Sequence, residues 1–436
     1  MQKLRYTICV LLMACLSVGA MAQNGLNAPF SQYGIGQSRL PFNMPQAAML
    51  GGVVYTQSGP NRVNPFNPAS YAAIQPTSFI FDMGLTIDMT TLRDPNTSLY
   101  DADGNLGYIA VAFPLTNWWK TSLGLLPLSD VNYESVQSVT GGPWGTMNTR
   151  YDGVGGVSRL YWGNGFNIGE RLSVGFNANF LYGNISRGIT YDFKDSTFFM
   201  DSRREKSTMI KNFTFDFGLL YNQPLNDKYT LNVGLTFTPH QNLRVQDKAL
   251  VYTFVTHSGL EYNRDTIFPG ADQDPEYTST LEQPMVVGLG LSLARNKKWM
   301  IAFDGTYAPW NGFKYAEDKE HNVFGTSALQ YGNNFRGSLG IQRLGNPDAA
   351  EYLRRVTFSA GCYREQGKLY LDPMQRLDEW GIGCGLSLPM RKGRSSLNIS
   401  ACYSRFGTAE LLRHDIVSFG ISIGSCETWF MKRKYN

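Results

Sequence analysis

The sequence predicts an all-β fold: a 14-stranded antiparallel transmembrane β-barrel with an N-terminal plug in its lumen. Three observations predict it: an export signal at the start of the chain, many segments of alternating apolar and polar residues, and connections of alternating short and long length. Residues 229–238 show the alternation without a break, since every odd-numbered side chain is apolar and every even-numbered one is small or polar. Such a period of two is that of a β-strand, and about ten residues cross a membrane as a tilted strand.

The first 22 residues predict a secretory signal peptide. Lys3 and Arg5 give a positive start, residues 6–19 are apolar, and Ala20-Met-Ala22 is a small-residue cleavage site. We therefore expect cleavage after Ala22 and a mature protein in the bacterial outer membrane.

The composition excludes several classes of protein. The formal net charge of +4 falls to about +2 once the signal peptide is removed, without the clustered positive charge of a nucleic-acid-binding protein. No run of eighteen apolar residues follows the signal, so no membrane-spanning helix is expected. An exported chain with 13% aromatic residues, 45 glycines and short alternating segments is typical of an outer-membrane barrel.

The cysteines indicate neither a metal nor a redox site. Cys15 belongs to the signal region, where it also permits an alternative interpretation as a lipoprotein processing site. Cys362, Cys384, Cys402 and Cys426 form no CxxC pair. The alternation places the first two on apolar faces and the last two on polar faces. They are either small strand residues or disulfide partners on neighbouring strands.

Residues 23–77 predict the plug. Seven prolines exclude regular strands, yet residues 44–54 are too apolar for a solvated linker. An apolar segment that precedes a barrel can bury its surface in the lumen. We therefore expect a plug segment at residues 23–77 and a barrel domain at residues 78–436.

Fourteen segments carry the alternating pattern. They cover residues 78–89, 107–115, 121–128, 153–163, 171–183, 211–222, 229–238, 284–293, 299–307, 331–342, 355–363, 380–388, 397–404 and 415–424. Six connections between them are short, and the seven others are mostly longer, up to the loop at 239–283. Short periplasmic turns, long external loops and an even strand number are the rule for outer-membrane barrels.

Catalytic and metal-binding patterns are missing. The sequence has no GxSxG, HExxH or phosphate-binding loop. The four histidines fall in expected loops or strand ends and are interpreted as solvated. Asp101 and Asp103 lack the full ligand spacing of a calcium loop. We therefore expect no enzyme activity, no metal and no cofactor.

Charged residues on the polar strand faces are candidate lumen groups, because a charge facing lipid at mid-depth costs about 2–4 kcal/mol. The alternation assigns six to the lumen: Asp82, Asp88, Arg159, Asp216, Asp304 and Arg336. They either hold the plug or, for the two arginines, meet an anionic head group on a translocation path.

Pro127 stands in the third alternating segment, where it removes a ladder donor. It marks a kink, a bulge or the end of that strand.

The plug region resembles the FadL/TodX family of outer-membrane transporters. The resemblance rests on the run Gln46-Ala-Ala-Met-Leu-Gly-Gly-Val-Val54, followed by Asn67, Pro68 and Ala69, ahead of fourteen strands. It implies passive diffusion of hydrophobic molecules, such as long-chain fatty acids or aromatic hydrocarbons, which leave sideways at a kink in the third strand. Pro127 is the candidate for that kink.

The predicted function is thus an outer-membrane channel for small hydrophobic molecules, in contact with membrane lipid. The alternative is a protein-binding barrel, because the same family includes shuttles of the type IX secretion machinery. Such a protein would bind secreted proteins or the secretion machinery. A general porin is a third possibility.

Overall fold

A computed structural model describes residues 28–95, 97–141, 145–194, 199–257, 260–267, 276–295, 298–311, 315–316, 330–346, 349–372, 375–390, 394–407 and 412–429. The predicted signal peptide and the first residues of the predicted plug lie outside these ranges.

Fourteen wall strands form a closed antiparallel barrel, so the predicted fold class is confirmed. Each strand pairs with the next in the chain, and β1 pairs with β21 from Ser78↔Thr428 to Arg93↔Arg413 to close the cylinder. The wall strands are β1 (Ser78–Arg93), β2 (Ser98–Pro114), β3 (Trp119–Thr140), β4 (Thr146–Ile168), β5 (Leu172–Phe193), β6 (Asp201–Pro224), β7 (Tyr229–Thr238) continued by β8 (Gln241–His257), β10 (Glu276–Gln283) continued by β11 (Val286–Arg295), β12 (Trp299–Ala308), β15 (Asn334–Arg343), β16 (Thr357–Gln366), β19 (Glu379–Met390), β20 (Ser395–Gly407) and β21 (Arg413–Thr428).

The remaining elements are short. The N-terminal segment holds η1 (Pro29–Gln32), α2 (Pro45–Ala48) and η2 (Pro68–Ala73). Others lie near the ends of the wall: β9 (Leu260–Ile267), β13 (Tyr315–Ala316), α3 (Tyr352–Arg355) and the small sheet of β14 (Gln330–Tyr331), β17 (Leu369–Asp372) and β18 (Gln375–Arg376). No helix of the described residues has the length and apolar character needed to cross a membrane.

The outer face of the barrel is apolar and ends in aromatic rings where the turns are short. Large outward side chains such as Phe213, Ile382 and Ile421 are exposed, as expected of a surface that meets lipid. At the short-turn end, the ring of Phe79 stacks on Trp429 at 4.5 Å between centroids, and Tyr229 meets Trp299 at 6.1 Å. Amphipathic rings favour this head-group level.

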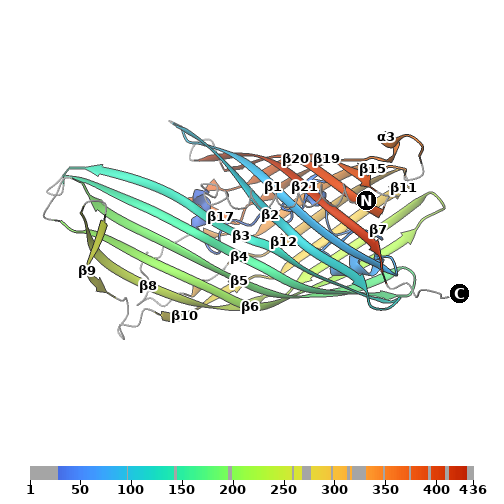
Figure 1. Ribbon diagram of the computed structural model, residues 1–436, viewed down its shortest axis with the longest axis horizontal. Coiled ribbons are helices and arrows are strands. Elements are labelled where there is room, and N and C mark those ends of the chain that lie inside the picture. Colours follow the sequence, from blue (N-terminus) through green and yellow to red (C-terminus); the bar gives the residue numbers. More distant parts are fainter. Residues whose placement is uncertain are drawn as a thin grey trace, which may run out of the picture.

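The wall is much taller on one side than on the other (Figure 1). Strands β3 to β6 have 22 to 24 residues, whereas β15 and β16 have 10 each. At about 3.3 Å per residue, the difference is roughly 40 Å of strand. The tall side lies at the end of the long connections, which the rule for such barrels places outside the cell.

Four predicted long loops are therefore wrong in extent. Residues 90–106, 129–152 and 184–210 are mostly strand, since β1 and β2, β3 and β4, and β5 and β6 continue as paired hairpins. In the predicted loop 239–283, β8 and β10 likewise continue the wall and pair with each other. The physical reason is that backbone pairing continues past the membrane, where both faces meet water or polar groups and the apolar alternation stops.

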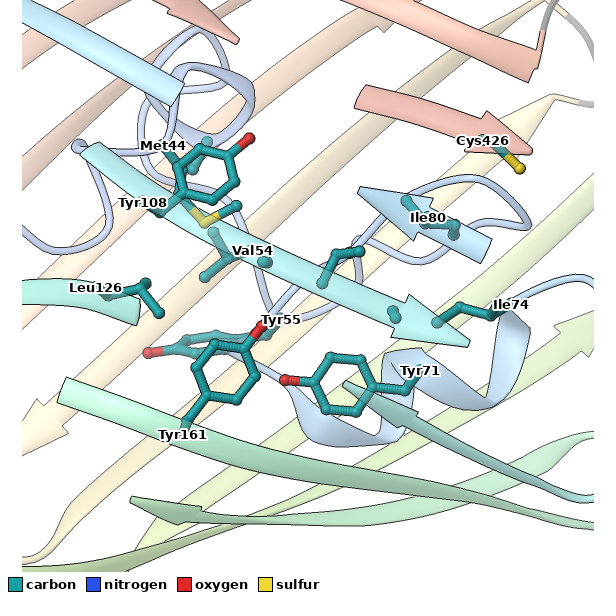
Figure 2. Packing of buried hydrophobic residues seen from close by; sticks show 14 residues of the cluster. Met44, Val54, Tyr55, Tyr71, Ile74, Ile80, Tyr108, Leu126, Tyr161 and Cys426 are labelled. Atoms are coloured by element: carbon teal, nitrogen blue, oxygen red, sulfur yellow. The ribbon is translucent and has the colours of Figure 1, made fainter. Parts of the chain in front are cut away.

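The N-terminal segment lies inside the barrel, and its core packs against the wall (Figure 2). Met44, Val54 and Tyr71 come from this segment, whereas Tyr108 and Tyr161 come from β2 and β4. The rings of Tyr71 and Tyr161 stack at 6.4 Å with an interplanar angle of 4°. The lumen is therefore filled at this level by close packing.

Candidate functional site: the plug, the wall fork and the lumen cavity

Glycines on the inner face of the wall receive the backbone of the plug. A Cβ added to Gly234 would lie 2.2 Å from the carbonyl oxygen of Tyr55, and one added to Gly361 would lie 2.2 Å from the carbonyl carbon of Leu50. Plug backbone comes similarly close at Gly165, Gly175 and Gly383, whereas plug side-chain atoms do so at Gly218, Gly290 and Gly385. A glycine inside a strand often marks such an approach of another backbone.

Two buried carboxylates of the wall bind the plug. Asp304 on β12 accepts hydrogen bonds from the backbone amides of Val54 (2.6 Å) and Tyr55 (2.8 Å). Asp82 on β1 accepts a hydrogen bond from the side chain of Gln46 at 3.1 Å and one from Tyr108 at 2.7 Å. Each carboxylate thus has donors aimed at it, which a buried charge requires.

A second pair of lumen charges contacts the segment before α2. Asp88 forms an ion pair with Arg39. Arg336 donates to the carbonyl oxygen of Leu40 at 3.2 Å, and its guanidinium lies 5.8 Å from the ring centroid of Phe42.

The last pair lies within the wall itself. Arg159 and Asp216 are 3.5 Å apart, and Asp216 also accepts hydrogen bonds from Asn179 (2.8 Å) and Thr238 (2.7 Å). Thus the six predicted lumen charges all point inward, but the structure does not bring them into one site. Their functional roles stay a prediction.

Asn67 is the capping residue of η2 and a link to the wall. Its side chain accepts from the amide of Ala69 at 3.1 Å and donates to the carbonyl oxygens of Tyr55 (2.7 Å) and Leu219 (3.2 Å). Pro68, at the first position of the helical turn, needs no hydrogen-bond donor there. The three-residue motif therefore ties η2 to another part of the plug and to β6.

The wall forks between β2 and β3. These strands pair over six positions, from Pro114↔Lys120 to Ile109↔Leu125. Beyond that point β2 pairs with β1 and β3 with β4. The register of β3 shifts between Pro127 and Ser129, so a bulge lies at the fork and β3 continues past it to Thr140.

A short stretch of the plug, which we call the covering segment (residues 35–43), closes this fork. Gln37 and Asp130 exchange both backbone hydrogen bonds, at 2.9 and 3.0 Å. The side-chain amide nitrogen of Asn43 donates to the carbonyl oxygens of Gly107 (3.0 Å) and Pro127 (3.3 Å). The free edge of β3 is therefore paired with the plug where its neighbour in the wall is missing.

The inner side of the covering segment lines a cavity of about 410 Å³. Leu128, Leu181, Leu243 and Leu281 contribute apolar lining on the tall side of the wall. Polar and charged groups contribute elsewhere: Arg39, Asp88, Arg336, Glu365, Glu379 and His414. The cavity is thus amphipathic, with a volume in the range of small-molecule pockets.

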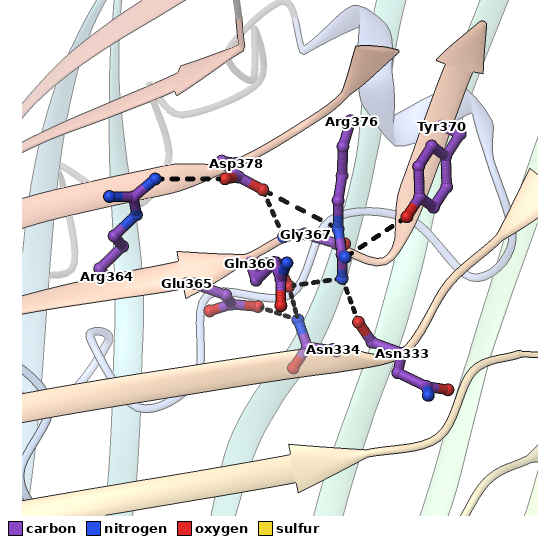
Figure 3. A network of polar contacts seen from close by, with 9 residues as sticks. All are labelled: Asn333, Asn334, Arg364, Glu365, Gln366, Gly367, Tyr370, Arg376 and Asp378. Carbon is purple, nitrogen blue, oxygen red and sulfur yellow. Dashed lines mark hydrogen bonds and ion pairs between the residues drawn. The ribbon is translucent and has the colours of Figure 1, made fainter. Parts of the chain in front are cut away.

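A polar network joins residues around β16, β17 and β18 (Figure 3), and three of its members, Asn334, Glu365 and Gly367, also line the cavity. The side chain of Asn334 donates to Glu365 at 2.8 Å, and Arg364 lies 3.7 Å from Asp378. Lys368 sits 4.2 Å from the ring centroid of Trp310, and burial lowers the pKa of its ammonium group while Glu365 raises it.

Of the four histidines expected to be solvated, His414 is not. It is 1% exposed and its ring lies 5.1 Å from that of Phe30. The expectation was wrong because η1 packs against β21, and no local sequence pattern predicts this contact. His240 is exposed, and the side chains of His257 and His321 lie outside the described residues.

The described residues hold no group of three or more His, Cys, Asp or Glu side chains that could bind a metal ion. The four mature cysteines are free: Cys362 and Cys384 are exposed, Cys402 is half-buried and Cys426 is buried.

Sequence reasoning missed the inner glycines and the covering segment. The glycines had a usable signal, since they recur on the polar faces of strands where a side chain would otherwise stand. The covering segment had none, because its contacts join residues about 90 positions apart, such as Gln37 and Asp130.

The barrel is similar in fold to several solved structures. The toluene transporter TodX of Pseudomonas putida matches with a TM-score of 0.55 at 16% identity, over 88% of this chain and 97% of that one. A FadL homologue of Pseudomonas aeruginosa matches with a TM-score of 0.54 at 15% identity, over 88% and 97%. The CymD monoaromatic hydrocarbon channel matches with a TM-score of 0.53 at 15% identity, over 89% and 97%. At these identities the likeness concerns the fold, and it confirms the predicted resemblance to FadL/TodX barrels at that level.

A search of curated proteins gave no match. A family model described as BamG matches residues 3–436, which is nearly the whole sequence. The chain therefore belongs to the BamG family, with the fold of a FadL-like outer-membrane barrel.

Proposed function

We propose that the protein is an outer-membrane channel through which small hydrophobic molecules, such as long-chain fatty acids or aromatic hydrocarbons, diffuse passively. One observation carries the proposal: the covering segment both lines the lumen cavity and closes the wall fork. A shift of this single segment would connect the cavity sideways to the lipid around the barrel.

The cavity suits an amphipathic or apolar ligand. Leucines on the tall side of the wall offer apolar contact, and Arg336 offers a charge to a carboxylate head group. Such a ligand would enter between the long hairpins, rest in the cavity and leave through the fork. The covering segment would move, while Asp304 and Asp82 hold the remainder of the plug in the lumen.

Uptake of labelled fatty acids and monoaromatic hydrocarbons tests the proposal in cells with and without the protein. The variant Ala308→Trp places a large ring in the cavity, because Ala308 lies on its lining and is 4% exposed. The matched control Ala401→Trp places the same ring on the opposite face of the wall, since β20 buries its neighbour Ser400 in the lumen. We expect uptake to fall only with Ala308→Trp. Equal uptake with and without the protein, across the whole panel, would refute the channel.

A second function, the binding of a protein, is supported by the tall side of the wall. Strands β3 to β6 rise well beyond the length that a membrane requires, and the predicted alternative was a barrel of the type IX secretion shuttle kind. Val136 and Val139 expose 53% and 44% of their surface on this extension. A photo-crosslinker at Val136 would capture a secreted protein or a component of the secretion machinery under this hypothesis. The same crosslinker at Ile382, on the membrane face, is the control.

A further inference from the structure

Arginines gather on the outer surface of the barrel, at the end of the apolar band nearest the long connections. We propose that this cluster, Arg93, Arg364, Arg405 and Arg413, binds the phosphate groups of a glycolipid head group in the outer leaflet of the membrane.

The backbone register places these side chains at one level of the wall. Arg364 on β16 is paired with Trp380 on β19, Trp380 with Arg405 on β20, and Arg405 with Asp415 on β21. Arg93 on β1 is paired with Arg413 on β21, two residues further out. Five neighbouring wall strands therefore contribute to a single patch.

The patch lies where a lipid head group would lie. On β21 the outward side chains of Ile423, Ile421, Phe419 and Val417 are exposed and apolar, and Asp415 follows two residues later. The ring of Trp380 lies 5.7 Å from that of Tyr403, and both rings have Arg405 within 6 Å of their centroids. Aromatic rings beside basic groups are typical of the membrane interface.

One carboxylate holds two of the arginines side by side. Arg405 Nε is 2.7 Å and Arg413 Nη2 is 2.8 Å from the two oxygens of Asp415, and Tyr403 donates to the same carboxylate at 2.8 Å. Arg93 is 4.0 Å from Asp415. The carboxylate thus orients guanidinium groups without matching their combined charge.

The excess positive charge of the cluster and the solvent exposure of its arginines favour a phosphate as the ligand. Against four guanidinium groups, the contacts of the described residues show two carboxylates, Asp415 and Asp378. The arginine side chains are 81% exposed at Arg364, 55% at Arg93 and 36% at Arg405. Guanidinium groups bind phosphate oxygens in a bidentate manner, and basic groups at the membrane surface attract anionic head groups. A phosphorylated glycolipid combines this anion with acyl chains that would cover the apolar band below.

Lipid retention tests the assignment. The protein is purified in detergent, washed, and its bound phosphorylated glycolipid is measured by mass spectrometry. The variant Arg93→Gln/Arg405→Gln/Arg413→Gln should retain at least about tenfold less lipid than the unchanged protein, a loss of about 1.4 kcal/mol in binding. The milder variant Arg93→Gln/Arg364→Gln leaves the close contacts of Asp415 with Arg405 and Arg413 intact and should show an intermediate loss.

The matched control replaces three exposed arginines at the opposite, short-turn end: Arg171→Gln/Arg354→Gln/Arg394→Gln. It removes the same charge and should retain lipid like the unchanged protein. A second arm offers the stripped protein vesicles that carry either phosphorylated or dephosphorylated glycolipid, and only the former should bind. Equal retention by the cluster variants, equal binding of the dephosphorylated lipid, or displacement of the lipid by millimolar inorganic phosphate would overturn the proposal.

Discussion

Replacing Asp304 by alanine should loosen the plug from the barrel wall. The carboxylate accepts the backbone amides of Val54 and Tyr55 at 2.6 and 2.8 Å, and Asp304 is 3% exposed. A hydrogen bond to a charged group contributes about 1.5–3 kcal/mol, and an unpaired buried amide carries a desolvation cost of its own. Asp304→Ala removes two such bonds, so the free energy of plug opening should fall by at least about 3 kcal/mol.

Hydrogen exchange of the plug measures this opening. The amides of Ala48 and Met49 are suitable reporters, because they bond within the plug, to the carbonyl oxygens of Met44 (2.9 Å) and Pro45 (3.0 Å). If exchange requires the plug to open, a loss of about 3 kcal/mol speeds it by about 150-fold, at 1.36 kcal/mol for each factor of ten. Asp304→Asn keeps an acceptor oxygen and loses only the charge, so its effect should be about 1 kcal/mol, or roughly fivefold.

Asp216→Ala is the control, since the contacts of Asp216 are to Arg159, Asn179 and Thr238 of the wall. It should leave the exchange of the plug near its original rate. Unchanged protection of Ala48 and Met49 in Asp304→Ala would show that this carboxylate does not hold the plug, and the reasoning would be refuted.

Three further predictions concern the plug and the wall. Gly234→Ala should displace the plug at Tyr55 and raise the conductance in planar bilayers. Gly305→Ala, whose added Cβ would lie 3.9 Å from the ring of Phe303, should not, and equal conductance of the two variants would contradict this. Asn67→Ala removes the cap of η2 and two hydrogen bonds to carbonyl oxygens. The free energy of plug opening should therefore fall by about 2 kcal/mol, and limited proteolysis should cut the plug faster by the corresponding factor. An apolar maleimide should label Cys384 in the folded protein and Cys426 only after unfolding, as followed by peptide mass spectrometry; labelling of Cys426 first would be the contrary result.

The wall could be predicted because a membrane imposes strict rules on it. Lipid outside and a polar lumen inside force a period of two, which is why the alternation found all fourteen wall strands and the inward direction of charges such as Asp82 and Asp304. Outside the membrane the rule lapses. The sequence therefore predicts loops where the tall hairpins of β3 to β6 stand, although their backbone pairing is continuous.

The contacts of the covering segment could not be predicted, for a different reason. The covering segment follows no period, and its partners Gly107 and Asp130 are distant in sequence. Pro127 gave a local hint of an irregular β3, but the separation of β2 from β3 is a property of two registers together. The arginine cluster on the outer surface could not be predicted either, because it depends on the registers of several strands. Each arginine alone resembles an ordinary residue at the end of a strand.

A disulfide between the covering segment and β3 tests the central claim most directly. Gln37 and Asp130 exchange both backbone hydrogen bonds, and residues so paired lie about 5.5 Å apart at Cα, within the reach of a disulfide. In Gln37→Cys/Asp130→Cys, with the native cysteines replaced by serine, oxidation should abolish uptake of the hydrophobic ligand and a reductant should restore it. Equal uptake by the oxidised and the reduced protein would contradict the account, because the fork would then play no part in transport.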